Sequence, residues 1–282
     1  MDRTEVLEKQ ALMEQKVQEA DVLLVGIGEE WNEDFAEIDK YPMLTAILQE
    51  MEMDSSLEWL IPFLEQLYIQ EHIERKREGT RIQAYQKLYQ LIKDKNYFIV
   101  TTCIDSIVGQ IGFDKEKIVE PCGSYHRLQC SQGCCAQLYP SDTFSRQLRE
   151  TLENQESVLA LQIPLCPECG MPLAFNNILR AQYYVQDGYQ TQWERYTKWL
   201  QLTLNKKLCI LELGVGMELP NIIRWPFEKI AYYNRKADFF RVHGTLYQLT
   251  EELGGKGKGG VTEGIAVSVA MNALEFFGVE RN

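Results

Sequence analysis

Residues 20–28 read ADVLLVGIG, an unbroken apolar run that ends in two glycines. Such a run predicts a buried parallel strand that leads into a tight turn. Further strands are predicted in YFIVTTCID at 97–105, KLCILELGVG at 207–216 and ADFFRVHG at 237–244. Helices are predicted around them at 2–20, 43–95, 189–204, 220–233 and, to close the chain, 262–277. This alternation indicates an α/β fold with a largely parallel sheet.

A cysteine-rich segment interrupts the alternation between the second and third of these strands. SYHRLQC at 124–130 and VLALQIPLC at 158–166 are expected to be short strands that lead into cysteine pairs. The candidate ligands are Cys130, Cys134, Cys166 and Cys169, with Cys135 as an alternative to Cys134. Four thiolates around one tetrahedral ion form a closed structural zinc site, and unrelated free thiols are the less favoured interpretation. We expect a zinc module at 121–175, inserted into a single domain that spans 1–282 and dependent on its ion for folding.

Composition and charge exclude several classes of protein. The chain has 282 residues, 45% of them hydrophobic, which is enough to bury a sizeable core. Its net charge of -12 would repel phosphate backbones, so no nucleic-acid partner is expected. No apolar run is long enough to span a bilayer, and the charged N-terminus is unlike a signal peptide, so no membrane partner and a cytoplasmic location are expected. In a reducing compartment, close cysteine pairs favour metal binding over disulfides.

Small and polar residues follow three of the predicted strands. Gly26 and Gly28 end the first, Thr101 to Asp105 the second, and Gly214 and Gly216 the third. Gly26 and Gly28 alone would indicate a plain strand–helix turn, because Trp31 stands where a G-x-G-x-x-G motif has its third glycine. Ligands of open parallel sheets bind beyond the carboxyl ends of the strands, however. Three such turns together predict a binding crevice at that edge.

The order of these segments resembles that of the sirtuin family over nearly the whole chain. ADVLLVGIG corresponds to the sirtuin strand that ends in a Gly-Ala-Gly-x-Ser loop, and YFIVTTCID to the strand that ends in Thr-Gln-Asn-Ile-Asp. EPCGSYHRLQCSQGC at 120–134 resembles the Glu-Leu-His-Gly-Ser segment and the first cysteine pair, and IPLCPECGMPL at 163–173 the second pair. The later segments are LELGVGMELPNIIRWPF at 211–227 and YYNRKADFFRVHGTLYQLTEEL at 232–253. Three short stretches, LELGVG, LQCSQGC and WPFEK, look closest to the macrodomain-linked class M sirtuins of bacteria, whose activity is protein mono-ADP-ribosylation.

The resemblance implies a Rossmann-like NAD-binding domain with an inserted zinc-binding module. It places Gly26 and Gly28 at the pyrophosphate of NAD, and Asp105 at the nicotinamide end, with Thr102 beside it. Gly214 and Gly216 would flank the adenosine ribose, and Asn234 would lie on the adenine side. Cys122, Asp105 and Cys103 are then the candidate catalytic residues.

The chain departs from the sirtuin pattern where deacylation needs specific groups. Cys122 stands at the position of the general-base histidine, and Cys103 at that of the asparagine. A general base contributes ~10²–10⁴-fold to a rate, and an ordinary thiol is mostly protonated at neutral pH. Glu29 and Glu30 replace the serine of the glycine turn and would repel a pyrophosphate unless they are turned away. Deacylation by the usual route is therefore not expected.

Three interpretations follow from the resemblance and these departures. An NAD-dependent protein mono-ADP-ribosyltransferase and a catalytically inactive module that binds NAD or ADP-ribose are about equally favoured, with a lean toward the enzyme. A zinc-bearing interaction protein with an empty crevice is well behind them. By analogy with class M sirtuins, the expected partners are a protein substrate, such as a lipoyl-carrier protein, and a macrodomain hydrolase.

Overall fold

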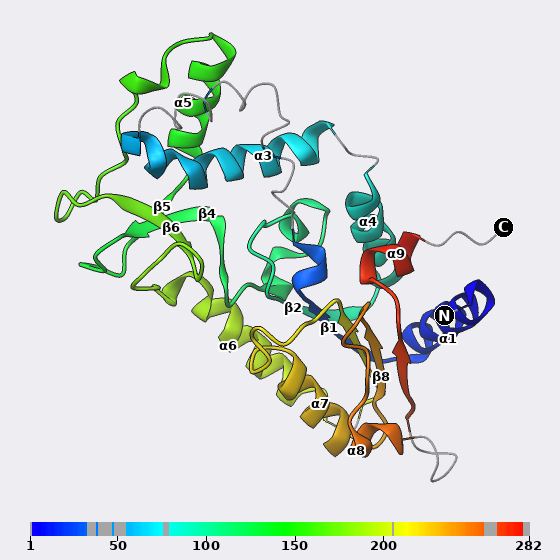
Figure 1. Cartoon of the computed structure of the whole chain (residues 1–282). Coiled ribbons are helices and arrows are strands. Elements are labelled where there is room, and N and C mark those ends of the chain that lie inside the picture. The colour runs from blue at the N-terminus through cyan, green and yellow to red at the C-terminus, as the bar shows by residue number, and fades with distance from the viewer. Residues whose placement is uncertain are drawn as a thin grey trace.

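A six-stranded parallel sheet organises the chain in a computed structural model that describes residues 2–32, 38, 47, 55–75, 79–204, 206–256 and 264–278 (Figure 1). Its strands are β1 (Val22–Ile27), β2 (Asn96–Thr101), β3 (Ile118–Val119), β7 (Leu208–Leu213), β8 (Asp238–Val242) and β9 (Ala266–Val269). They lie in the order β3-β2-β1-β7-β8-β9. This is the doubly wound order: successive strands are added on one side of β1 and then on its other side, while all of them stay parallel.

Helices cover both faces of the sheet because the side chains of each strand alternate between them. Leu23 and Val25 of β1 belong to the core shared with α1 (Arg3–Glu19), α4 (Thr80–Ile92) and α9 (Ala273–Gly278). Leu24 belongs to the core shared with α6 (Asp187–Gln201) and α7 (Arg224–Tyr233). Figure 1 shows these two helix groups on opposite sides of the strands. The predicted α/β fold with a parallel sheet is confirmed.

The cysteine-rich segment forms a second, three-stranded antiparallel sheet. Its strands are β4 (Gly123–Cys130), β5 (Leu138–Pro140) and β6 (Leu173–Asn177), in the order β5-β4-β6, and α5 (Asp142–Glu153) follows β5. The helix α3 (Ile61–Arg75) packs on this sheet through Phe63, whose ring lies 4.5 Å from that of Phe144 and 4.7 Å from that of Phe175. The sequence from β4 to β6 thus builds a separate layer, while the exact limits 121–175 stay a prediction.

Three local predictions were wrong. The expected final helix at 262–277 is instead the strand β9 followed by the short α9, since Phe239 to Val242 of β8 offer an edge on which Ala266 to Val269 pair. The segment 158–166 is not a strand. Ser157 accepts the N–H of Leu159 and starts a 3-10 helix at Val158–Ala160.

The helix α6 also differs from its prediction. The spacing of Trp193, Tyr196 and Trp199 predicts that all three pack into the core, but Trp193 is 36% exposed and only Tyr196 is fully buried. Trp199 lies at the rim, where its indole N–H donates to Asn96 Oδ1 at 2.8 Å. Residues three apart lie about 60° apart around a helix, so Tyr196 is at the centre of the face that meets the sheet and the two tryptophans are at its margins.

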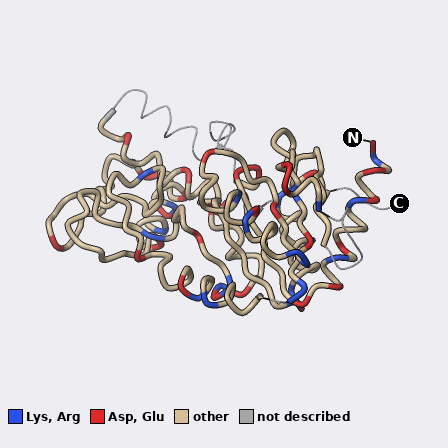
Figure 2. Tube along the Cα trace, turned by 90° about the horizontal axis from the view of Figure 1, so that it is seen from below, with Lys and Arg blue, Asp and Glu red and all other residues tan. Residues whose placement is uncertain are grey.

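Part of another predicted element lies outside the described residues, namely most of 43–54 in the helical region predicted at 43–95. Within the part of the chain that the structure describes, no helix is both long and apolar enough to cross a membrane. Figure 2 shows Lys and Arg interspersed with Asp and Glu along the tube.

Candidate active site and metal centre

The turns after β1, β2 and β7 meet at one edge of the parallel sheet. Ile27 of β1 is paired with Thr101 of β2 and with Leu213 of β7, so the three strands end at the same level. The structure therefore brings together the turns that carry six of the predicted residues, namely Gly28, Thr102, Cys103, Asp105, Gly214 and Gly216. Gly26 lies inside β1, where a Cβ would lie 2.4 Å from Ile223 Cγ2, so this glycine permits the packing of α7.

The glycines allow the β1 and β7 turns to touch. The N–H of Gly28 donates to the carbonyl of Leu213 at 2.9 Å, and a Cβ on Gly28 would lie 2.4 Å from the Cα of Val215. Gly214 has a φ of +63°, in the left-handed region that favours glycine. Both glycines are therefore required for the close contact between the chain's own turns.

Two carboxylates occupy the backbone donors at this edge. Glu29 Oε2 accepts the N–H of Gly216 at 2.5 Å. Glu30 accepts the N–H of Gly244, after β8, at 2.9 Å through Oε1, and that of Ala273, after β9, at 2.8 Å through Oε2. The carboxylates point toward the β7, β8 and β9 turns, and they hold the N–H groups that an anionic ligand could otherwise use.

The β2 turn carries the predicted polar residues. The N–H of Thr102 donates to the carbonyl of Ile27 at 3.0 Å, and its buried hydroxyl has no hydrogen-bond partner among the described residues. Asp105 is 3% exposed, and its Oδ1 accepts the N–H of Ile107 at 3.0 Å. The Cys103 thiol lies 3.2 Å from the carbonyl of Gly28. Burial raises the pKa of Cys103 well above its ordinary value, with the Asp105 charge adding to it, so this thiol stays protonated and donates.

Cys122 lies in the short connection between the edge strand β3 and β4, and it is completely buried. Burial, with a contribution from the charge of Glu29, raises the pKa of Cys122 to about 12. A thiol with that pKa is protonated at neutral pH and cannot accept a proton from a ribose hydroxyl. The thiol therefore does not replace a histidine base.

Asn234 is the one predicted cofactor residue that the structure sets apart. It follows α7 and precedes β8, whereas Gly214 follows β7, which runs parallel to β8. Asn234 therefore lies at the amino ends of the strands, and the crevice at their carboxyl ends. The five residues of β8 separate these two edges by roughly 16 Å at strand rise. Asn234 closes its own turn instead, since its Oδ1 accepts the N–H of Lys236 at 3.1 Å.

A buried ion network beneath the crevice was not predicted. Glu212 of β7 accepts two bonds from Arg241 of β8, with Nε–Oε1 and Nη2–Oε2 distances of 2.5 and 3.0 Å. Arg224 lies 3.6 Å from the same carboxylate and donates to the carbonyls of Val215 at 2.7 Å and Leu246 at 2.6 Å. The network fixes the loops after β7 and β8. Its sequence signal was a charge inside each of two apolar strands, LCILEL and DFFRV.

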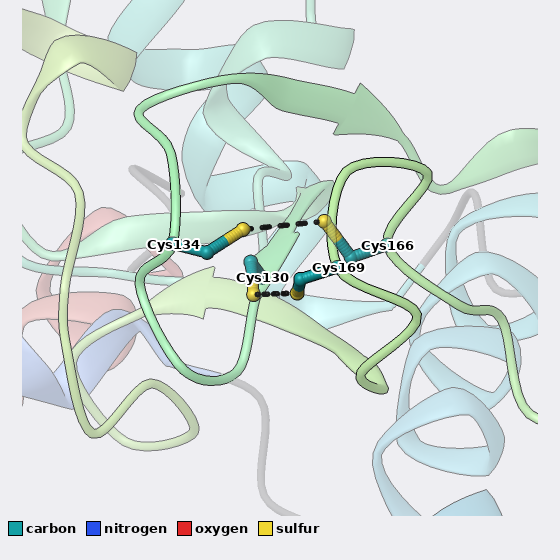
Figure 3. A group of neighbouring side chains, drawn as sticks. All are labelled: Cys130, Cys134, Cys166 and Cys169. Atoms are coloured by element: carbon teal, nitrogen blue, oxygen red, sulfur yellow. Dashed lines mark hydrogen bonds between the residues drawn. The ribbon is translucent and has the colours of Figure 1, made fainter.

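The four predicted metal ligands converge in the second layer (Figure 3). Their sulfur atoms all lie within 4.8 Å of one another, with 3.5 Å between those of Cys130 and Cys169 and 3.6 Å between those of Cys134 and Cys166. A tetrahedral ion with Zn–S bonds of ~2.3 Å separates its sulfur ligands by about 3.8 Å. The cluster is therefore compatible with zinc, and it includes Cys134 rather than Cys135.

The local backbone prepares this cluster for a cation. Chiefly the N–H of Cys134, with that of Gln132, lowers the pKa of Cys130. Burial opposes ionisation of Cys166, but the N–H groups of Cys169 and Glu168 lower its pKa overall. The pKa of the second thiol in each pair is raised, that of Cys134 chiefly by its hydrogen bond with Cys169. Each knuckle therefore offers one thiol that ionises readily, and thiolates are the form that ligates a metal.

Comparison with known proteins gives the chain its relatives. No family model matches it. It is 25% identical over 253 residues to a protein ADP-ribosyltransferase of Staphylococcus aureus (strain Mu50 / ATCC 700699), covering 84% of this chain and 78% of that protein. It is 28% identical over 170 residues to a probable bifunctional ADP-ribose hydrolase/ADP-ribosyltransferase of Fusarium oxysporum f. sp. cubense, covering 58% of this chain but only 28% of the fungal protein.

Among solved structures, a Sir2 mutant with a p53 peptide and NAD has a similar fold. The two superpose with a TM-score of 0.51 at 15% identity, over 99% of this chain and 96% of that one. The parallel sheet and the four-cysteine cluster agree with this likeness. The chain thus has the fold of the sirtuins and a sequence similar to that of a protein ADP-ribosyltransferase.

Proposed function

We propose that the chain is an NAD-dependent protein ADP-ribosyltransferase. The observation that carries this proposal is its similarity to a protein ADP-ribosyltransferase over 84% of its length, on a sirtuin fold. NAD supplies the ADP-ribosyl group: its bond to nicotinamide breaks, a bond to the acceptor side chain forms, and the acceptor's proton is released. The acceptor is a side chain of a protein substrate.

The β2 turn offers groups that fit the nicotinamide end of NAD. The buried hydroxyl of Thr102 has no partner among the described residues, and Asp105 is fixed beside it by its bond to Ile107. We propose that Thr102 and Asp105 bind and orient the cofactor there, and that the turns of Gly28, Gly214 and Gly216 lie along its phosphates and ribose. At the β7 to β9 turns, the cofactor has to compete with Glu29 and Glu30 for backbone N–H groups.

The state of Cys122 favours transfer over deacylation. Deacylation in sirtuins uses a general base on the ribose, and a protonated, fully buried thiol does not supply one. Transfer to a nucleophilic acceptor needs less from the enzyme, since the acceptor provides the attacking atom. Cys122 and Cys103 then shape the site without exchanging protons.

A binding module without turnover is the second candidate. The carboxylates of Glu29 and Glu30 fill three backbone donors at the crevice edge, and this favours a site that has lost productive NAD binding. Such a module would hold NAD, ADP-ribose or a partner protein.

We propose further that the four-cysteine cluster binds one structural zinc ion, with no open position for chemistry. By analogy, we propose a lipoyl-carrier protein as substrate and a macrodomain hydrolase as functional partner. The fungal relative is named as both an ADP-ribose hydrolase and an ADP-ribosyltransferase, which supports the hydrolase as partner. A cytoplasmic location is proposed with them.

Incubation of the purified chain with NAD labelled in the adenylate half separates these functions. Nicotinamide release with label on protein is expected, and Asp105→Asn should abolish both. Asp94→Asn, in the exposed turn between α4 and β2, is the matched control and should leave both unchanged. Binding of NAD without release supports the module instead, and absence of binding overturns both functions.

A further inference from the structure

A cavity lies beside the segment that follows β2, which contributes Ser106 to its lining. Its volume is about 240 Å³, and it is enclosed by the β3 edge, by β4 and by the first turns of α6. None of the crevice residues Gly28, Thr102, Gly214 and Gly216 lines it. It is therefore a separate site from the NAD crevice proposed above.

Ser106 lines this cavity and has an unpaired hydroxyl. The residue is 1% exposed, and its buried Oγ has no hydrogen-bond partner among the described residues. Buried hydroxyls are nearly always paired, so this one remains available to a ligand atom that reaches it from the cavity. Ser106 also has a φ of +62°, a strained conformation for a residue with a side chain.

Two cations line the same cavity. Arg127 of β4 donates through Nη1 to the carbonyl of Gly188, which fixes its guanidinium against the first turn of α6. A Cβ on Gly188 would lie 2.7 Å from Asn176 Oδ1 and 3.0 Å from Arg127 Nη1, so the glycine permits this approach. Lys115 lines the cavity from the opposite wall and forms no ion pair with a described residue. The N-terminus of the fifteen-residue helix α6 adds a partial positive charge.

Acidic residues oppose these charges: Asp187 lies in the first turn of α6, and Glu120 lines the cavity and is half-buried. Burial raises the pKa of Glu120 to about 7 against the opposing charge of Arg127; the Asp105 charge adds to the rise, and the Lys115 charge opposes it. The repulsion that Glu120 exerts on an anion is therefore weakened near neutral pH.

We propose that this cavity binds a small oxyanion, a free phosphate or a metabolite that carries a phosphate or carboxylate group. Arg127 and Lys115 supply the charge, and Ser106 and the amide of Gln192 line the cavity with them, whereas the Asn176 amide already donates to Gln129 and to the carbonyl of Val185. A volume of about 240 Å³ is ample for a small oxyanion. The site is independent of the proposed transferase activity, and each can fail without the other.

Isothermal titration of the full chain with inorganic phosphate and, separately, with succinate tests the site. Binding of either ligand is expected, and the stronger of the two identifies the group. Arg127→Gln and Lys115→Met should each weaken binding at least about tenfold, because each removes a charge-assisted hydrogen bond. Lys117→Met is the matched control, since Lys117 is paired with Asp114 and does not line the cavity.

Two more variants should change the affinity for the anion in opposite directions. Glu120→Gln should strengthen binding, because it removes the negative charge. Ser106→Gly should weaken binding while it raises the melting temperature, because glycine adopts the left-handed conformation without strain. Lys115 is exposed, so its variant folds even where another does not. No binding of either anion at millimolar concentration, or equal affinity in the Lys115→Met and Lys117→Met variants, overturns the proposal.

Discussion

Glu30→Gln tests whether the carboxylates at the crevice edge hold the C-terminal turns together. Each oxygen of Glu30 accepts one backbone N–H, that of Gly244 at 2.9 Å and that of Ala273 at 2.8 Å. A glutamine has one acceptor and one donor at its end, so either orientation leaves one backbone N–H facing an NH₂ group. We therefore expect the free energy of unfolding to fall substantially.

The magnitude follows from the two contacts. A hydrogen bond to a charged group contributes about 1.5–3 kcal/mol, and a buried donor left without a partner costs about 1–3 kcal/mol. The Glu30 side chain is only 13% exposed, so water compensates little. We expect a loss of about 2–4 kcal/mol, which lowers the melting temperature by roughly 5–10 °C in a chain of this size.

Glu29→Gln is the matched control. Glu29 accepts one N–H, that of Gly216, and a glutamine oxygen can keep that bond. Its expected loss is no more than about 1 kcal/mol, the charge assistance alone. Differential scanning fluorimetry with urea unfolding measures both variants. Equal melting temperatures for the two variants would refute the assigned contacts and, with them, the argument that NAD competes with Glu29 and Glu30.

The remaining predictions concern the metal, the ion network and pH. Cys166→Ser should lose the bound zinc and much of the stability, whereas Cys135→Ser should keep about one zinc per chain by elemental analysis; equal metal content would contradict the four-cysteine assignment. Arg241→Ala should cost about 3–5 kcal/mol in urea unfolding, because it leaves the buried Glu212 carboxylate without its main partner, and a loss below 1 kcal/mol would speak against the network. The Glu120 pKa is about 7 when folded against 4.5 ordinarily, so the folded state holds more protons and stability falls as pH rises between these values. Glu120→Gln should remove that fall and be more stable than the parent at pH 8; an unchanged pH profile would exclude the shift.

The sequence alone was sufficient for the main strands and the metal ligands. The strands β1, β2, β7 and β8 are apolar runs with glycine or polar ends, a pattern that needs no tertiary information to interpret. The cysteine pairs are equally local, because two or three intervening residues set whether two sulfurs can reach one ion. The order of these segments then carried the sirtuin resemblance, which the fold comparison bears out.

Long-range pairing decided what the sequence left open or misplaced. Ile265, Val267 and Val269 alternate with small residues, which is a strand pattern, but only the pairing with β8 shows that 266–269 form a strand rather than part of the predicted helix. Asn234 follows the crevice residues closely in sequence, yet it lies at the opposite edge of the sheet. It precedes β8, whereas the crevice lies where the parallel strands end, so the whole length of β8 separates them.

The residues 20–28 fixed the position of the first strand and its turn, because burial of an apolar run and the conformational freedom of glycine are properties of the residues themselves. Only the tertiary structure showed that Glu29 and Glu30, directly after that turn, bond to the turns of β7, β8 and β9. It alone also showed that Cys122 is a buried, protonated thiol and that Ser106 lines a cavity. Hydrogen-bond partners and pKa values depend on which distant segments the fold brings within contact distance, and a linear sequence does not contain those distances.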